Sequence, residues 1–146
     1  MRLLIANRWK EDRGSSLVEF SLIAFMFIIV LLGVVDMSRM VLVYTTVANA
    51  ARAGARYAIV HGGDLTAGAS GPGNTTQIQT VVQNFASAGL IDTSKLNITV
   101  TYPYNTNTAG SPVSVTVTYT YDPLVAYFNS ILNTTVGSTS EGVITF

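Results

Sequence analysis

The sequence predicts an α+β protein in which a long N-terminal helix packs on a small antiparallel sheet with short helices. Three observations predict this fold. An apolar run without any charge extends from Phe20 to Val35. Small and apolar residues then continue at helical spacing as far as Gly62. Further along, two segments alternate apolar and polar residues with a period of two, which is typical of half-buried strands.

The composition indicates a membrane-associated protein. The chain is 49% hydrophobic and 11% charged, whereas about 25% charged residues is usual in soluble proteins. Lys95 is the one Lys or Arg after Arg56, so the C-terminal part cannot neutralise many phosphates and we expect no binding of nucleic acid. The chain has no cysteine, which rules out disulfides, thiolate nucleophiles and cysteine-based metal sites.

The apolar run predicts a membrane span at about residues 17–35. From Leu17 to Val35 a helix is about 28 Å long at 1.5 Å per residue, close to the thickness of a hydrocarbon core. The run is apolar around its whole circumference, unlike a surface helix of a soluble domain. A cleaved signal peptide is disfavoured because no small-x-small site follows the run.

The charges that flank the span predict its orientation. Four cationic residues precede it, and Arg39 follows it; the four are Arg2, Arg8, Lys10 and Arg13. Since Lys and Arg favour the cytoplasmic side, residues 1–14 are predicted to be cytoplasmic and the chain from Asp36 onward to be exported.

The helix is predicted to be continuous over residues 15–62, with the first half in lipid and the second half on the exported domain. No proline interrupts it, and Gly62-Gly63 end it. Its second half has an apolar stripe with many small residues, for which packing on the domain's own strands is favoured over a subunit interface. The stripe comprises Met37, Met40, Val41, Tyr44, Val47, Ala48, Ala51, Ala55, Ala58 and Ile59.

The exported domain is predicted to span residues 63–146. A capping box of Thr76 and Gln79 opens a short helix that ends at Gly89. Two strands follow, over residues 96–102 and 113–121, and a last strand over residues 134–146. Between these strands, Asp122-Pro123 predicts the start of a helix over residues 124–132.

The sequence offers no constellation for catalysis, so we predict that the protein is not an enzyme and has no cofactor or metal. His61 is the one histidine and stands at the predicted helix end, where it is favourable without any catalytic role. No cluster of His, Cys or carboxylate residues has the spacing of metal ligands.

Two motifs resemble those of TadE-like pseudopilins of the tight-adherence (Flp, type IVb) pilus system. They are Arg13-Gly14-Ser15-Ser16-Leu17-Val18-Glu19-Phe20 and Ala50-Ala51-Arg52-Ala53-Gly54-Ala55-Arg56. The resemblance implies a pilin-like fold and a cytoplasmic prepilin-type leader over residues 1–14, which a prepilin peptidase removes between Gly14 and Ser15. It also implies a single-pass protein of the bacterial inner membrane that acts in pilus assembly and cell adhesion.

The partners that the resemblance implies are the prepilin peptidase, other pilins and pseudopilins, the inner-membrane assembly platform and membrane lipid. The exported domain is too large for a major Flp pilin, so the resemblance favours a minor pseudopilin. Entry into the filament, capping of it and retention in the membrane all fit this interpretation. The alternative is an unprocessed, signal-anchored extracytoplasmic binding module.

Within these motifs, Glu19 is the candidate assembly carboxylate. It would be the fifth residue of the mature chain, and an unpaired carboxylate at the mouth of a membrane helix is costly. We expect it to pair with the new α-amine of Ser15 in the same or a neighbouring subunit, although a simple interaction with the helix dipole is the alternative. Arg52, Gly54 and Arg56 are candidate interface residues.

Overall fold

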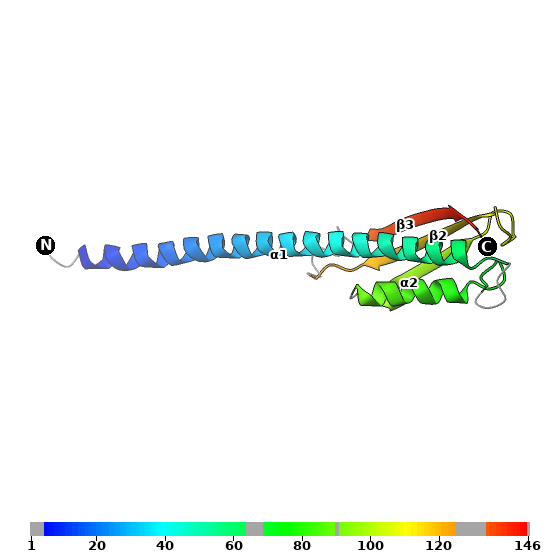
Figure 1. Cartoon of the computed structure of the whole chain (residues 1–146). Coiled ribbons are helices and arrows are strands. Elements are labelled where there is room, and N and C mark those ends of the chain that lie inside the picture. Colours follow the sequence, from blue (N-terminus) through cyan, green and yellow to red (C-terminus); the bar gives the residue numbers. More distant parts are fainter. Residues whose placement is uncertain (1–4, 64–68, 90, 125–133, 146) are drawn as a thin grey trace. The chain divides into compact units, whose positions relative to one another are not determined.

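The computed structural model describes residues 5–63, 69–89, 91–124 and 134–145, and for residues 5–13 it describes the backbone alone. The elements in chain order are helices α1 (Ile5–Val60) and α2 (Thr76–Ala88), the 3₁₀ turn η1 (Thr93–Lys95), and strands β1 (Leu96–Thr101), β2 (Pro112–Tyr121) and β3 (Thr134–Val143) (Figure 1). This arrangement confirms the predicted α+β class. The chain divides into two units, Met1–Ser38 and Arg39–Phe146.

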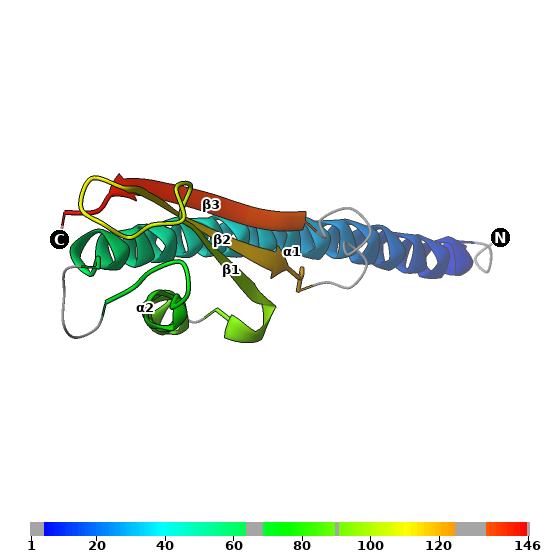
Figure 2. The ribbon, with the colours of Figure 1, turned by 90° about the vertical axis from the view of Figure 1, so that its right-hand side faces the viewer.

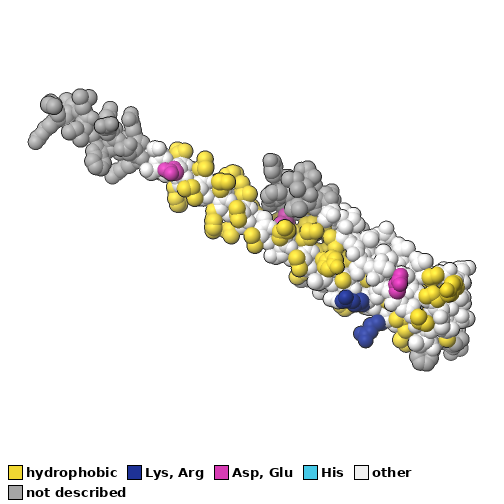
Figure 3. Space-filling model, turned by 90° about the horizontal axis from the view of Figure 1, so that it is seen from above, with side chains coloured by type: hydrophobic (Ala, Val, Ile, Leu, Met, Phe, Trp, Pro, Cys, Tyr) yellow, Lys and Arg dark blue, Asp and Glu magenta, His cyan; other side chains and the backbone are white. Residues whose placement is uncertain are grey.

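In the first unit, α1 exposes large apolar side chains on every side. Phe20 is 72% exposed, Phe25 64% and Phe27 62%, and hydrophobic side chains cover this stretch in Figure 3. By length and composition, the helix from Gly14 to Val60 can cross a membrane, and no residue of its most apolar window is buried. The helix begins at Ile5, ahead of the predicted start at Ser15.

In the second unit, the three strands form an antiparallel sheet in the order β1-β2-β3. Figure 2 shows the strands side by side, with the C-terminal stretch of α1 behind them and α2 alongside. The register pairs Ile98 with Val117 and Val117 with Ser138. Burial alternates along β1 and β2, as predicted: in β1 half-buried residues alternate with exposed ones, and in β2 buried residues alternate with less buried ones. Strand β3 shows a similar alternation.

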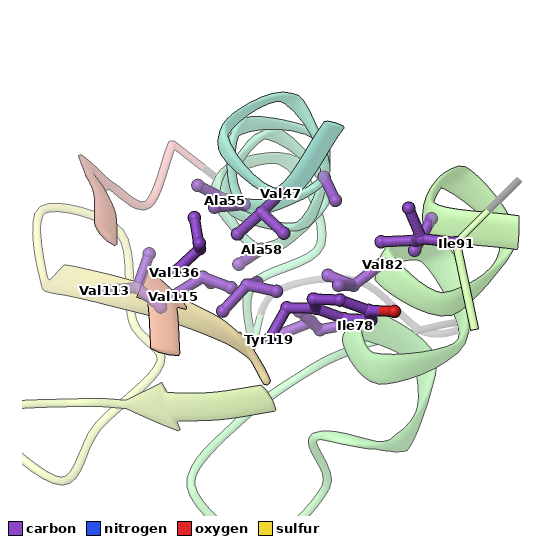
Figure 4. Close-up of a cluster of buried hydrophobic side chains, with 14 of the residues drawn as sticks. Val47, Ala55, Ala58, Ile78, Val82, Ile91, Val113, Val115, Tyr119 and Val136 are labelled. Atoms are coloured by element: carbon purple, nitrogen blue, oxygen red, sulfur yellow. The ribbon is translucent and has the colours of Figure 1, made fainter. Parts of the chain in front are cut away.

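The core lies where α1 and α2 meet the inner face of the sheet (Figure 4). The small residues of α1 bring its backbone close to the sheet, and larger side chains from the other elements fill the space between them. The residues labelled in Figure 4 are Val47, Ala55 and Ala58 of α1, Ile78 and Val82 of α2, Ile91, and Val113, Val115, Tyr119 and Val136 of the sheet.

The predicted face of α1 is only partly correct. Val47, Ala51, Ala55 and Ala58 are buried, as predicted, and so are Val43 and Ala50. Val41 and Tyr44, which the prediction also placed on the buried face, are instead 63% and 55% exposed. At about 100° per residue, Tyr44 falls within the arc of the buried residues and Val41 lies about 40° outside it, so spacing alone assigned both to the buried face.

The predicted capping box at α2 is wrong. The helix begins at Thr76, so Thr75 is the residue at its N-cap, and its side chain caps no backbone N–H. Gln79 instead donates its side-chain Nε2 to the Thr75 hydroxyl at 3.4 Å. The predicted end of α2 at Gly89 is confirmed, since Gly89 is its C-cap.

The last strand forms despite the two glycines in its sequence. A Cβ at Gly142 would collide with the side chain of Ile59, so the glycine allows β3 to lie directly on α1. The helix predicted over residues 124–132 falls, beyond Leu124, outside the described residues. Asp122, predicted as its cap, makes an ion pair with Lys95.

Gly54 is the residue at which α1 comes closest to the other layers. A Cβ there would lie 2.5 Å from Cγ2 of Val82 and 3.2 Å from Cγ1 of Val115. Because valine is stiff at χ1, neither neighbour can move away at low cost. Gly54→Ala should therefore destabilise the domain by about 1–2 kcal/mol, as overpacking exceeds the gain in helix propensity.

Thermal unfolding followed by the near-ultraviolet circular dichroism of the tyrosines measures this effect. Gly33→Ala is the matched control, since a Cβ at Gly33 meets nothing within 4 Å. A Gly54→Ala protein that unfolds at the wild-type temperature would contradict the packing described here.

Asp92 caps the turn η1 and offers a local test of the fold. Its carboxylate accepts hydrogen bonds from the Ser94 hydroxyl at 2.7 Å and the Ser94 backbone N–H at 3.0 Å. The hydroxyl bond is the main cause of a lowered Asp92 pKa, and the backbone bond adds to it. The stability this gives is present above the unfolded pKa and is lost as pH falls through the folded pKa.

Ser94→Ala should raise the Asp92 pKa toward its ordinary value and leave it still below that value, because the backbone bond remains. Carbon-13 NMR titration of the aspartate carboxyls measures the change. Ser87→Ala is the control, since its hydroxyl binds the Asn84 carbonyl. An Asp92 pKa that responds equally to both substitutions would disprove the assignment.

Candidate processing and assembly site

The predicted processing residues lie together near the N-terminal end of α1. Gly14, Ser15 and Glu19 are all in the helix and all exposed. Ser15 and Glu19 are four residues apart, so they occupy one face of the helix about one turn apart. Within the described part of the chain, Glu19 makes no hydrogen bond or ion pair. A carboxylate therefore stands one turn from the backbone nitrogen that cleavage after Gly14 would release.

Packing does not require a glycine at position 14. A Cβ built on Gly14 meets no described atom within 4 Å, in contrast to Gly54. Glycine in a helix interior is less stable than alanine by roughly 0.5–1 kcal/mol. Gly14 is thus a weak point of α1 that no described contact explains.

The second motif is divided between the surface and the core. Arg52 and Arg56 are exposed and lie one turn apart on one face of α1, while Gly54 is buried against α2 and β2. Arg52 donates from Nη1 to Oδ1 of Asn49 at 3.1 Å. No ion pair involves either arginine among the residues that the structure describes. The position of Gly54 agrees with the favoured prediction that the small residues pack within the domain.

A hollow of about 410 Å³ in the second unit was not foreseen from the sequence. Its walls carry the Lys95–Asp122 ion pair, which raises the pKa of Lys95, and Arg39, whose guanidinium carbon lies 6.0 Å from the ring centroid of Tyr121. These contacts join residues far apart in the chain, so no local pattern signals them. Among the described residues, two cations and two carboxylates line the hollow, the second carboxylate being Asp92.

The side chain and backbone of His61 contact neighbouring parts of the fold. Its ring stacks on Tyr57 with the centroids 3.9 Å apart, and Nδ1 lies 3.0 Å from the Tyr57 carbonyl oxygen. The His61 carbonyl accepts hydrogen bonds from the backbone N–H and the hydroxyl of Ser70. Among the described residues, no group of three His, Cys, Asp or Glu side chains is placed to hold a metal ion.

Comparison with known proteins bears on the same N-terminal segment. The family model described as TadE-like protein matches residues 14–56, which run from the predicted cleavage position to the second arginine of the later motif. The search of the curated proteins and the search of the solved structures gave no match. The resemblance inferred from the two motifs is therefore confirmed: over residues 14–56 the chain is TadE-like, consistent with a TadE-like protein of the tight-adherence pilus system.

Proposed function

We propose that this protein is a minor pseudopilin that a prepilin peptidase cleaves between Gly14 and Ser15 and that contributes to Flp-type pilus biogenesis and adhesion. The observation that carries the proposal is the coincidence of three features at one place. The TadE-like match begins at Gly14, the exposed apolar stretch of α1 begins shortly after it at Leu17, and an exposed carboxylate at Glu19 follows one turn beyond Ser15.

In this proposal, the leader lies in the cytoplasm and the second unit lies outside the inner membrane. The four cations before the apolar stretch and the single Arg39 after it favour that orientation. The peptidase then acts at the cytoplasmic face, before the apolar helix, which remains in the membrane as an anchor after the leader has been removed.

Gly14 has the properties that a processing position needs. A protease cleft binds an extended backbone, so α1 must open locally at this point. Glycine lowers the cost of that opening because it is a poor helix former, and it adds no Cβ to a narrow cleft. Since Gly14 has no described packing neighbour, recognition is a better reason for its presence than the fold.

Glu19 provides the assembly contact in this proposal. After cleavage, the α-amine of Ser15 is a new cation close to the membrane, and Glu19 of the same or a neighbouring chain is its natural partner. The pairing is favoured in a setting of low dielectric, where an isolated carboxylate is costly. The contact then fixes the register in which subunits meet.

The apolar surface of α1 beyond the predicted span supports assembly further. Val41, Leu42 and Tyr44 are each more than half exposed in the second unit. Tyrosine is favoured at membrane–water interfaces, and contiguous apolar patches mark sites that a membrane or a partner covers. Lipid headgroups and neighbouring helices are the partners that fit this surface.

The mature N-terminus tests the processing step. We expect mass spectrometry of the protein from its native membrane to show a chain that begins at Ser15. Gly14→Val should leave the leader attached, whereas the matched substitution Gly33→Val should be processed normally. A native chain that retains Met1 would refute the proposal and favour a signal-anchored binding module.

Glu19→Gln tests the assembly step separately. The amide keeps the shape of the side chain but cannot pair with the α-amine of Ser15. We expect the variant to be membrane-bound and cleaved, and its amount in sheared pili or its support of piliation to fall by roughly tenfold, as for a lost charged contact of about 1.4 kcal/mol. Asp92→Asn, at another exposed carboxylate, is the control. Wild-type piliation by Glu19→Gln would remove the assembly role.

A further inference from the structure

The second unit carries opposite charges on the outer surfaces of its two layers. We propose that Arg52 and Arg56 bind the outer face of the sheet of a second copy of this chain, around Glu141. The proposal rests on the pseudopilin function proposed above, because it names the surface that neighbouring subunits use outside the membrane.

The helix side of this interface is defined by the exposed stripe of α1. The stripe includes Val41, Thr45, Asn49, Arg52, Arg56 and Val60. Arg52 and Arg56 are its charged members, and among the described residues neither has a carboxylate partner. Lys and Arg side chains form a small group on this part of the surface in Figure 3. Two guanidinium groups one turn apart are therefore available to acceptors on another molecule.

The sheet side is a flat, hydroxyl-rich surface with a single charge. Strands β1, β2 and β3 contain no Lys or Arg, and Glu141 is their one acidic residue. Glu141 is exposed and pairs across the ladder with Ser114, beyond which lies Thr101. Next to this row, the hydroxyls of Thr116 and Thr139 lie 2.9 Å apart. This surface offers one carboxylate and several hydroxyl acceptors to guanidinium donors.

The two charged surfaces lie at the same level along α1. Gly142 packs directly on Ile59, and the backbone N–H of Thr145 donates to the Ile59 carbonyl at 2.9 Å. Glu141 is therefore held beside the last turns of α1, and Arg56 lies about one turn before Ile59. A neighbouring copy that lies side by side, with little axial shift, brings its Glu141 opposite Arg56 and its Thr139 toward Arg52.

The arrangement selects a head-to-tail contact. The exposed side of α1 and the outer face of the sheet carry opposite charges. A two-fold contact through either outer face would place like charges together, whereas helix against sheet pairs opposite charges. A contact of this kind joins different surfaces of the two copies, so each copy keeps one of the two surfaces unpaired.

Cysteine cross-linking tests the proposal cleanly, because the chain has no native cysteine. Val60→Cys lies on the helix stripe and Val143→Cys on the outer sheet face; both native side chains are exposed. Full-length chains carrying one substitution each are produced together in the native membrane and treated with a short bis-maleimide. We expect a covalent dimer from the mixture and none from either variant alone. Gln83→Cys, exposed on α2, replaces Val143→Cys as the control.

Charge exchange tests the role of the named residues. Arg56→Glu in the Val60→Cys chain should lower the dimer yield by roughly two- to fivefold, the effect expected for an exposed ion pair. Glu141→Arg in the Val143→Cys chain should restore it. A dimer from Val60→Cys alone, no dimer from the mixture, or a yield that ignores both charge changes would each overturn the inference. Processing at Gly14, read by mass spectrometry in the same samples, separates a failure of this contact from a failure of the proposed function.

Discussion

The structure depends on one helix that must satisfy two different surroundings. From Phe20 to Val35, α1 carries no charge and exposes large apolar side chains on every side, which is stable only where the surroundings are also apolar. From Arg39 onward, one face of the same helix is buried by the sheet and α2, and the opposite face carries Asn49, Arg52 and Arg56. The change from exposure on every side to burial of one face marks where the candidate membrane anchor ends and the packed unit begins.

The domain meets α1 through residues that have almost no side chain. Gly54 lets α2 and β2 reach the helix backbone, and Gly142 lets β3 lie on Ile59. Large side chains at these positions would separate the layers and leave voids in the core, which costs contact energy. From Arg39 onward the helix is therefore part of the domain's core.

Sequence reasoning succeeded where the signal is local. Alternation over β2 gave the buried face of the strand, because side-chain direction in a strand repeats every two residues. It failed where position depends on tertiary contacts. Nothing near Val41 shows that it lies on the exposed side of α1, and nothing near Lys95 shows that Asp122 lies beside it. The glycines of β3 reduced the strand signal, although Gly142 is there to admit Ile59.

The difference between local patterns and tertiary contacts also explains which residues of the candidate site could be predicted from the sequence. Gly14 and Glu19 belong to one short motif, so their spacing along the chain is also their spacing along the helix. No sequence motif pointed to Glu141, because the role proposed for it depends on β3 lying beside the last turns of α1. Only the folded sheet shows that the Glu141 carboxylate is exposed among Ser and Thr hydroxyls. The residues proposed for processing and assembly at the N-terminal end of α1 can thus be found from sequence, while the contact proposed at Glu141 can be found only from the fold.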